Sequence, residues 1–487
     1  MNTEVRHVAN GFGVDVINQL LDDPVASTVA QALHEALGAV YVVGGAPRDV
    51  LLGKKPKDFD LVVFGMETHE VLETLQALPG RVSQDGQSFS VFRYRENRGR
   101  PVEVSLPRVE RSTGPGHKDF EVIADPWAIL RDDMARRDFT CNALAVSYDI
   151  AMVFDYNGGI EDIAKRELRV LSTRSFIDDP LRIMRALTAY ARHDLYPEKQ
   201  TLAWMREYAY RLEHLPQERC RDELDKIMES DDPARAIVLA HDTGCLEYFL
   251  PEVEACFGFN QNNPHHELEL GDHLLNTLER SCWVTDDKDV RLAALLHDIG
   301  KPLSVWEDPD TGVWHYYEKR WPDGRTEGKD HAVVGADMTW YRLTALHYEN
   351  ARINRMTGIV KHHMYAGFDT KRGARRFLSR VGDLWSPLLK VRWADQGGKS
   401  TSSHHEKGGP WDVMVNLNLI EEVLEAREAF DRKGLAIDGR DLIDLGQKPG
   451  PMMGELLDAM VAIVITDPEH NTRDHLLSFA RAWIDAN

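Results

Sequence analysis

A buried strand that runs into two consecutive glycines constrains this chain more than any other feature. Residues 40–43 form a short apolar run rich in β-branched side chains, and Gly44 and Gly45 end it, which predicts a strand entering a turn. Glycines between a strand and a helix free backbone N–H groups to approach a triphosphate. Arg48 adds a charged fork for phosphate oxygens. The segment therefore predicts a phosphate-binding loop, and a plain turn is the alternative.

A pair of carboxylates follows this turn. Asp58 and Asp60 stand two residues apart on a second predicted strand, residues 59–64, so we expect both side chains on the same face. Two such carboxylates repel each other unless a cation lies between them, and they suit Mg²⁺ bridging a nucleotide and an attacking hydroxyl. Glu103 lies on a later predicted strand and is the candidate for a third carboxylate. The alternative is a solvated strand edge; the combination with the glycine turn favours the metal site.

Composition limits the classes of protein that remain. The 487 residues allow about three domains. The 58 Lys and Arg residues against 79 Asp and Glu give a net charge of −21, which excludes a uniformly basic nucleic-acid coat protein but not an enzyme with a local basic face. The five cysteines form no C-x-x-C pair, so we expect neither a disulfide framework nor a zinc ribbon. We expect no membrane span, and a cytoplasmic location.

Along the chain the predicted elements change from strands to helices. Residues 1–157 have the pattern of a small α/β domain, and from about residue 158 the pattern is helical. Residues 303–330 interrupt the helices and predict a β-hairpin insertion. Residues 111–126 are rich in Gly, Pro and charge, which predicts a mobile loop, and residues 398–411 have the composition of a linker.

Three motifs in the first 162 residues point to one family. The string G-G-x-x-R-D-x-x-L-G-x(4)-D-x-D-L-V, residues 44–62, resembles the signature of class II CCA-adding enzymes and bacterial poly(A) polymerases. Residues 136–144 are similar to the family's R-R-D-F-T-x-N-A motif, and residues 155–162 to its D-x-x-G-G-x-x-D hinge. The resemblance implies an α/β nucleotidyltransferase head, a small mixed sheet with helices, followed by mostly α-helical neck, HD and tail domains. It also implies nucleotide contacts by Gly44, Gly45, Arg48, Asp49, Arg136, Arg137, Asp138, Asn142, Asp179, Arg182 and Arg185.

Residues 178–182 resemble the family's E-D-x-x-R base-selecting motif and carry a chemical argument of their own. At i and i+3 on a helix, Asp179 and Arg182 would face the same way. The carboxylate can accept from the amino group of cytosine or adenine, and the arginine can donate to a ring acceptor; uracil and guanine present a carbonyl at that edge. Such a pair selects C and A without a template. Asp178 stands where the family has Glu, and an N-cap role is the alternative for either aspartate.

A second group of residues is typical of a metal site. Four residues follow in the order H…HD…D and resemble the HD phosphohydrolase superfamily: His273, His297, Asp298 and Asp395. Imidazole and carboxylate ligands suit Ni, Mn, Fe or Mg, with a bound water made nucleophilic. His331 and one of His362 or His363 are candidates for a second metal, with solvated histidines as the alternative. In relatives that keep this domain, the resemblance implies a phosphatase and 2′,3′-cyclic phosphodiesterase.

The C-terminal region carries a candidate RNA contact. Residues 435–451 resemble the tail of CCA-adding enzymes and poly(A) polymerases. Gly450 lies between two predicted helices, where free N–H groups at a helix N-terminus can hold a backbone phosphate. Arg440 and Lys448 would add positive charge. A helix-breaking turn is the alternative.

These observations predict four domains: a head at 1–157, a neck at 158–255, an HD domain at 256–400 and an RNA-binding tail at 401–487. We expect template-independent addition of C and A to the 3′ end of tRNA from CTP and ATP, with Mg²⁺ in the head. A poly(A) polymerase or an A-adding enzyme shares these motifs and stays an alternative, as does an HD phosphohydrolase whose head only binds RNA. The sequence leaves open the HD metal, coupling between the two sites and a possible homodimer.

Overall fold

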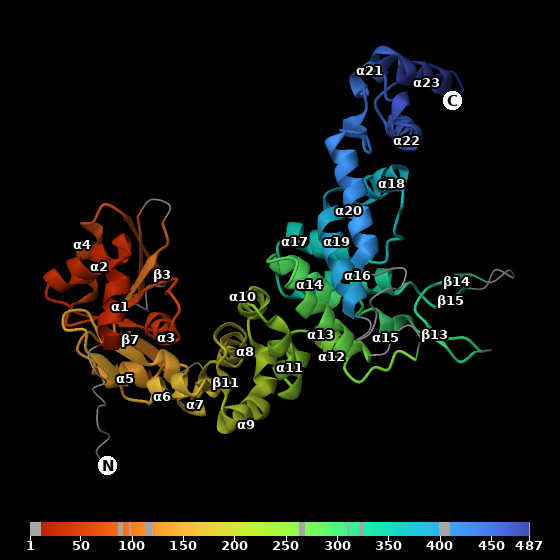
Figure 1. Cartoon of the computed structure of the whole chain (residues 1–487). Coiled ribbons are helices and arrows are strands. Elements are labelled where there is room, and N and C mark those ends of the chain that lie inside the picture. The colour runs from red at the N-terminus through yellow and green to blue at the C-terminus, as the bar shows by residue number, and fades with distance from the viewer. Residues whose placement is uncertain are drawn as a thin grey trace. The chain divides into compact units, whose positions relative to one another are not determined.

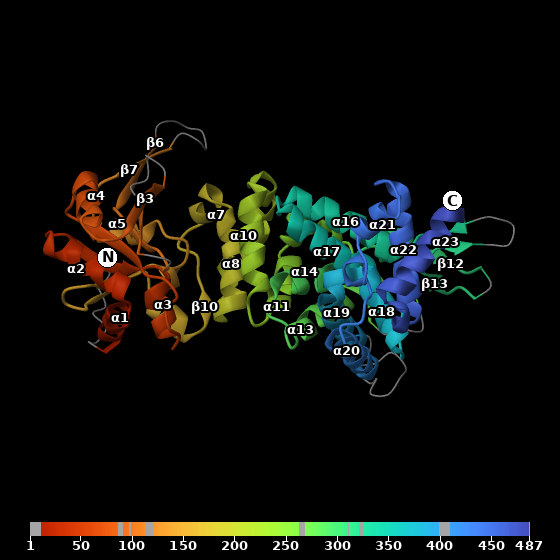
Figure 2. The same cartoon turned by 90° about the horizontal axis from the view of Figure 1, so that it is seen from above.

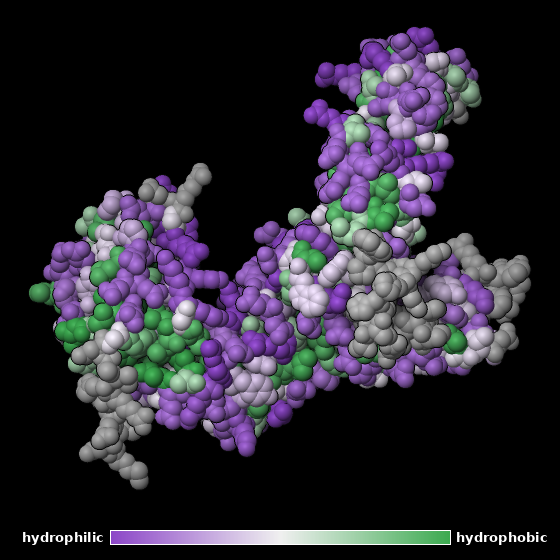
Figure 3. All heavy atoms as spheres, in the orientation of Figure 1, coloured by the Kyte–Doolittle hydropathy of each residue, from purple (hydrophilic) through white to green (hydrophobic). Residues whose placement is uncertain are grey.

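The computed structural model describes residues 11–85, 91–96, 99–112, 120–262, 268–309, 311–320, 326–398 and 410–486. The chain divides into two units (Figure 1). The first consists of Met1–Ile227 with Val238–Tyr248, and the second of Met228–Ile237 with Phe249–Asn487. Figure 3 shows hydrophilic residues over much of the visible face of both units. Within the described ranges, no helix combines the length and the apolar character that crossing a membrane requires.

A seven-stranded mixed sheet forms the centre of the first unit. Its strands lie in the order β3-β4-β5-β2-β1-β8-β9. Parallel pairing joins β2 to β5, and the other neighbours pair antiparallel. The bounds are β1 Ala39–Val43, β2 Asp60–Phe64, β3 Arg81–Asp85, β4 Val91–Arg95, β5 Val102–Ser105, β8 Leu144–Ser147 and β9 Val153–Asp155. The small mixed sheet that the sequence predicts is confirmed.

Helices pack on this sheet through apolar faces. Val16 and Leu33 are fully buried in the same core cluster as Leu61 of the central strand β2. The second helix begins where it does because Asp23 accepts hydrogen bonds from two backbone N–H groups and Pro24 occupies its first turn. The helices of this part are α1 Gly11–Leu21, α2 Pro24–Glu35, α3 Gly45–Leu51, α4 Thr68–Gln76 and α5 Leu130–Ala135.

The loop predicted at residues 111–126 is partly wrong. β6 (Arg108–Ser112) and β7 (Phe120–Ala124) pair antiparallel and form a two-stranded ribbon outside the main sheet. The glycines, prolines and charges that predicted a loop are concentrated before residue 120, whereas Phe-Glu-Val-Ile-Ala at 120–124 is a β-forming run. Residues 113–119 lie outside the described part of the chain.

Helices dominate the rest of the first unit. In both views α8 and α10 lie side by side (Figures 1 and 2), and the Thr188 hydroxyl of α8 donates to Glu223 of α10 at 2.7 Å. A two-stranded parallel ribbon, β10 Glu167–Leu168 with β11 Tyr196–Pro197, flanks them. The helices are α6 Gly159–Ala164, α7 Arg174–Asp178, α8 Leu181–His193, α9 Lys199–Tyr208 and α10 Gln217–Met228, followed by α11 Pro233–Asp242 at the border of the two units.

The second unit is built around α14 (Lys288–Leu296), which is buried along nearly its whole length. Its last five residues, 292–296, are all apolar, as expected of a helix in a core. Here α13 (Leu270–Ser281), α17 (Asn350–His362) and α19 (Trp385–Gly398) pack around it. The remaining helices are α12 Pro251–Glu254, α15 Lys301–Ser304, α16 His331–Ala345, α18 Lys371–Val381, α20 Pro410–Glu425, α21 Gly439–Asp444, α22 Pro451–Thr466 and α23 Arg473–Ala486.

The predicted insertion at 303–330 forms two short antiparallel ribbons rather than one hairpin. They are β12 Trp306–Glu307 with β13 Trp314–His315, and β14 Lys319–Arg320 with β15 Thr326–Glu327. Residues 321–325 of the insertion lie outside the described residues, as does most of the predicted linker.

Candidate active sites

The carboxylates of the first unit meet at one end of two parallel strands. Asp60 is the first residue of β2, and its register partner on β5 is Glu103. Phe59 is buried while Asp58 and Asp60 are exposed, so alternation places both aspartates on the solvent side as expected. Asp58, however, precedes the strand instead of belonging to it. The ligand atoms of these three carboxylates do not form one close group among the described residues.

The glycine turn lies directly against Asp60. Gly44 caps α3 with φ +73°, a conformation that glycine adopts readily and other residues rarely do. A Cβ atom on Gly44 would stand 2.9 Å from Asp60 Oδ2 and 3.5 Å from an Arg137 guanidinium nitrogen. The turn, one carboxylate and one arginine of the 136–144 motif therefore lie together in space.

Charge is concentrated at Asp60. Its side chain keeps accessible surface, yet the protein atoms packed around it and the negative charge of Glu103 raise its pKa to about 6, against the opposing effect of Arg137. A raised carboxyl pKa means that the ionised form lacks enough positive charge nearby. A divalent cation would supply that charge, and oxygen-only donors fit Mg²⁺.

A series of polar contacts joins α3, the helix that follows the glycine turn, to α8. Arg48 donates to the Asn142 side-chain oxygen at 2.7 Å, and the Asn142 amide donates to Asp138 at 3.0 Å. The other Asp138 oxygen lies 2.8 Å from Arg185. Burial opposes ionisation of Asp138, but Arg185 and the hydrogen bonds from Asn142 and the Phe139 N–H outweigh it and lower the pKa. Arg48 also pairs with Asp49 at 2.7 Å. The motif residues thus form one connected network.

Asp133 is a site residue that the sequence reasoning missed. Its carboxylate is fully buried and accepts from Arg136 Nε at 2.9 Å and from Arg137 at 3.4 Å. The spacing i, i+3 and i+4 on α5 and the turn after it is the signal that could have identified it. Asp133 orients both arginines of the motif.

The predicted placement of Asp179 on a helix with Arg182 is wrong. Asp179 adopts an extended conformation between α7 and α8, and Arg182 is the second residue of α8. Pro180 follows Asp179, and the residue before a proline is disfavoured in helices. Asp179 instead accepts from the Leu181 N–H at 3.3 Å and from Arg219 at 3.1 Å, while Pro180 occupies the N-cap position of α8. Arg182 donates to the Arg136 carbonyl at 2.9 Å, while Asp178 is exposed.

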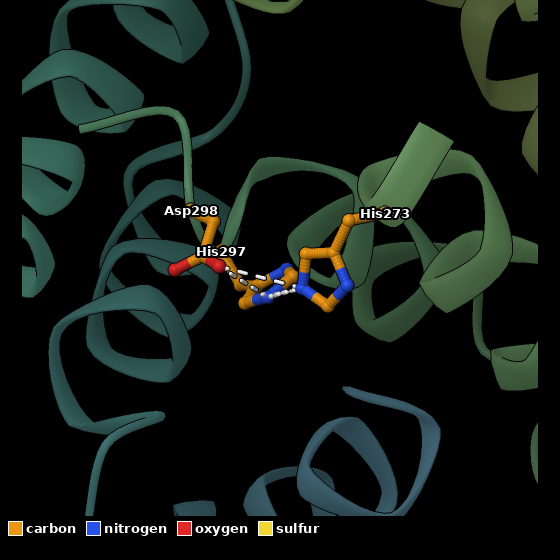
Figure 4. Close-up of side chains that lie close together, drawn as sticks. All are labelled: His273, His297 and Asp298. Carbon is orange, nitrogen blue, oxygen red and sulfur yellow. Dashed lines mark hydrogen bonds and ion pairs between the residues drawn. The ribbon is translucent and has the colours of Figure 1, made fainter. Parts of the chain in front are cut away.

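The HD residues of the second unit converge in a buried cluster. His273 of α13 and His297 at the end of α14 approach each other at 3.2 Å between Nε2 atoms (Figure 4). Asp298 Oδ2 lies 3.4 Å from the first and 3.2 Å from the second. Asp395 of α19 completes the group, 3.2 Å from His273 Nε2. Helices α13, α14 and α19 therefore bring together the four residues of the predicted pattern.

A second group of three shares Asp298. Its other oxygen, Oδ1, lies 3.2 Å from His331 Nε2 and 3.3 Å from His363 Nε2. The alternative position His362 is wrong, because α17 ends there and the next residue turns inward instead. His362 stays partly exposed beside Arg380 and Lys361, with a pKa lowered by burial and by these charges.

Backbone contacts fix the orientation of three of these rings. The Nδ1 atoms of His297, His331 and His363 lie 2.8, 2.8 and 2.7 Å from the carbonyls of Ala294, Tyr316 and Val360. An Nδ1–H that donates to a carbonyl leaves Nε2 with a lone pair directed into the cluster, the arrangement of a metal-ligating histidine.

The cluster fits a divalent metal ion. Asp298 Oδ1, His331 Nε2 and His363 Nε2 are buried acceptor atoms without a hydrogen-bond partner, which a cation between them would relieve. Burial disfavours the protonated form of His297, but the negative charges of Asp298 and Asp395 outweigh this effect and raise its pKa to about 9. The cluster therefore favours a positive charge among these residues. Lys301 is buried beside the cluster and lies 2.7 Å from Asp298 Oδ2 and 2.8 Å from Gln261.

The three tail residues are exposed at the surface. Arg440 lies on α21, Lys448 in the following loop, and Gly450 caps the first turn of α22. Their RNA-binding role stays a prediction.

Comparisons with known proteins match both sites. A family model described as "Poly A polymerase head domain" matches residues 40–169, and a model of the "HD domain" matches residues 270–382. An A-adding tRNA nucleotidyltransferase of Deinococcus radiodurans is 32% identical over 452 residues, which cover 91% of this chain and 95% of that protein. This chain belongs to the tRNA nucleotidyltransferase family.

Other members of the tRNA nucleotidyltransferase family match a shorter part. The multifunctional CCA protein of Teredinibacter turnerae is 37% identical over 278 residues, 55% of this chain and 64% of that protein. The matched region thus spans less than two thirds of the curated multifunctional relatives. A family model described as "tRNA nucleotidyltransferase domain 2 putative" matches residues 413–480, which include α21 and α22 and most of α20.

Solved tRNA nucleotidyltransferases share the fold. The CCA-adding enzyme of Bacillus stearothermophilus has a TM-score of 0.68 at 20% identity, covering 96% of this chain and 98% of the other. The enzyme of Thermotoga maritima has a TM-score of 0.58 at 20% identity, covering 99% and 100%. At this identity the likeness establishes an α/β head followed by helical parts.

Proposed function

We propose that this chain extends the 3′ end of tRNA with C and A, using CTP and ATP without a template. The observation that carries the proposal is the parallel register of Asp60 with Glu103, beside a glycine turn that only a Cβ-free residue can form so close to Asp60. The carboxylates of Asp60 and Glu103, the glycine turn and Arg137 therefore lie close together. The printed names of relatives, CCA-adding and A-adding, support the same chemistry.

The residues divide the work of nucleotidyl transfer. Mg²⁺ held by Asp58, Asp60 and Glu103 would supply charge stabilisation to the transferring phosphate. The Gly44–Gly45 backbone and Arg137 would bind the triphosphate, and the contact of Arg48 with Asn142 supports a role for Arg48 beside them. The RNA 3′-hydroxyl attacks the α-phosphate and pyrophosphate leaves.

Base selection rests on the segment between α7 and α8. Leu181 N–H and Arg219 hold the Asp179 carboxylate, which leaves lone pairs for the amino group of cytosine or adenine. Arg182, anchored on the Arg136 carbonyl, would donate to a ring acceptor. A base with a carbonyl at this edge would leave the carboxylate unpaired, at a cost of about 1–3 kcal/mol.

A second candidate is addition of A alone. The relative that aligns along nearly the whole chain is an A-adding enzyme, whereas the multifunctional CCA proteins match 55% of it. The site geometry suits both, so product composition decides.

We also propose that the HD cluster hydrolyses phosphoesters at RNA 3′ ends. A metal held by His273, His297, Asp298 and Asp395 would activate a water molecule. The backbone contact of His297 supports this ligand role, and those of His331 and His363 support a second metal beside it. We place the enzyme in the cytoplasm, because its five cysteines are all unpaired.

Product length on tRNA lacking its last three nucleotides tests the transfer. With Mg²⁺, we expect two additions from CTP alone and three from CTP with ATP. One A added only to tRNA that already ends in CC would establish the A-adding alternative. A long ladder from ATP would indicate a poly(A) polymerase.

The matched control is Asp58→Ala, which should abolish addition while hydrolysis of a 2′,3′-cyclic phosphate persists. Addition by Asp58→Ala at the normal rate would contradict the proposed site. Absence of any addition by the unaltered chain would make the HD cluster the working centre.

A further inference from the structure

An arginine in the second unit packs against two tryptophans that also contact each other. The Arg280 guanidinium carbon lies 5.2 Å from the centre of the Trp283 ring and 4.9 Å from that of Trp393. The two indoles meet edge to face, with centroids 6.3 Å apart. Trp283 is 65% exposed. Two such cation–π contacts restrict the position of the guanidinium.

The chain leaves room for this guanidinium at Gly397. A Cβ atom there would lie within 2.2 Å of three atoms of the Arg280 side-chain head. Gly397 has no need of glycine for its backbone, because it lies within α19 with ordinary helical geometry. The glycine therefore serves the position of the arginine.

No carboxylate of the described residues pairs with Arg280, and its buried Nε lacks a hydrogen-bond partner. The nearest acidic neighbour in sequence is the exposed Glu279, and Asp286 pairs with Arg291 instead. A second cation, Lys390, lies on the same stripe of α19, three residues before Trp393. Its ammonium makes only a 3.5 Å contact with Thr285. Two cations and two indoles thus share one surface.

This surface adjoins the HD cluster. Arg280 follows His273 by seven residues on α13, which returns it to the same helix face about 10 Å along the axis. On α19 the guanidinium packs against Gly397, two residues beyond the ligand Asp395. A chain that reaches the cluster can contact this surface as well.

We propose that Arg280, Trp283, Lys390 and Trp393 form a contact for single-stranded RNA leading to the HD cluster. The cations bind backbone phosphate and Trp283 stacks on a base, a combination that accepts any sequence. In a chain with a net charge of −21, such an unpaired cationic surface suits an anionic polymer. The inference rests on RNA being the substrate of the proposed HD reaction.

The test uses the full chain and a seven-nucleotide single-stranded RNA ending in CCA and a 3′-phosphate. After ultraviolet crosslinking and peptide mapping, we expect crosslinks on the peptide with Trp393, reduced about ten-fold in Arg280→Gln. In fluorescence anisotropy, Trp283→Ala should weaken binding by about five- to hundred-fold. Arg280→Gln should also lower the slope of log affinity against log salt by about 0.7.

Trp340→Ala is the matched control, because Trp340 is another exposed tryptophan of the same unit, at 43%. It should bind as the unaltered chain does. Unchanged affinity and crosslinks in Trp283→Ala and Arg280→Gln would show that the stack is structural only. Arg280→Lys checks folding, since it keeps the charge but loses the fork. Crosslinking does not require catalysis. Failure of the RNA contact proposed here can therefore be distinguished from failure of the proposed nucleotide addition or hydrolysis.

Discussion

At the residue scale, His193 should make the first unit sensitive to acid. The side chain is 17% exposed; burial, and the positive charges of Arg48 and Lys54, lower its pKa to about 2. Its Nδ1 lies 3.8 Å from Asp49, but an ion pair with Asp49 would raise the pKa of His193. The lowered pKa therefore means that the His193 imidazole is neutral in the folded state. Because this pKa is lower in the folded than in the unfolded state, the neutral His193 contributes its whole stabilisation above the unfolded-state pKa of about 6.5. The free energy of unfolding then decreases as the pH falls below that value.

The measurement is the free energy of unfolding in urea at pH 7 and pH 5. The decrease should be larger in the unaltered chain than in His193→Gln, by about 1–2 kcal/mol. Equal decreases in both proteins would mean that the folded state accepts the proton.

The residues of the HD cluster show what sequence could and could not resolve. His273, Asp298 and Asp395 are recognisable because their order in the chain is distinctive. The choice between His362 and His363 depends on how α17 ends, where a hydrogen bond from the ring to the Val360 carbonyl turns His363 inward. The side chains of adjacent helical residues point about 100° apart. An error of one residue in the predicted end of the helix therefore decides whether a histidine faces the cluster or the solvent.

At the element scale, α16 is held against the HD cluster by a glycine. A Cβ on Gly300 would lie 2.2 Å from the His331 carbonyl and 2.5 Å from the Gly335 nitrogen. Gly300→Ala must therefore push away the helix that begins with His331. We expect Mn²⁺ affinity and phosphoester hydrolysis to fall by about ten- to hundred-fold, with nucleotide addition unchanged.

Gly367→Ala is the control for that prediction, because a Cβ there would meet only ordinary contacts of 3.6 and 3.7 Å. Metal affinity is measured by titration calorimetry. Normal Mn²⁺ binding by Gly300→Ala would mean that His331 is not a ligand.

The first turn of α6 depends on one carboxylate. Asp155 is 8% exposed. Its carboxylate accepts hydrogen bonds, at 2.8 to 3.2 Å, from the backbone N–H groups of Asn157, Gly158, Gly159 and Ile160. Asp155→Ala leaves these donors without their partner and should lower the free energy of unfolding of the chain by about 2–4 kcal/mol. Glu161→Ala, on the same helix but at the surface, should have a much smaller effect in the same denaturation experiment. A comparable loss in both would refute the capping role.

Elements were predicted well where one physical signal dominated. The apolar runs of β1 and β2 are such cases. The β6–β7 ribbon escaped prediction because the composition of the intervening segment obscured two five-residue strands. Asp179 was placed on a helix because helical spacing was applied across Pro180, which instead begins a new helix. Tertiary contacts such as Asp179 with Arg219 leave no periodic trace in sequence.

At the scale of the whole molecule, the two units carry donor sets of different chemistry. The head site consists of carboxylates alone, with Asp60 and Glu103 in register. The HD cluster combines histidine nitrogens with carboxylates. Oxygen donors suit Mg²⁺, whereas imidazole favours transition metals. The two donor sets therefore predict two different ions.

This difference predicts separate recovery after chelation. Dialysis against EDTA should abolish both nucleotide addition and phosphoester hydrolysis. Mg²⁺ alone should restore addition, because the head offers only oxygen donors, while hydrolysis should return fully with Mn²⁺ or Ni²⁺, which imidazole binds more strongly. Both reactions are followed on one gel with a tRNA lacking its CCA end and an RNA ending in a 2′,3′-cyclic phosphate. His297→Ala should recover addition with Mg²⁺ and never recover hydrolysis, and Asp60→Ala should do the reverse. Recovery of hydrolysis in His297→Ala would mean that the reaction belongs to another site, and loss of addition there would mean that the two units are coupled.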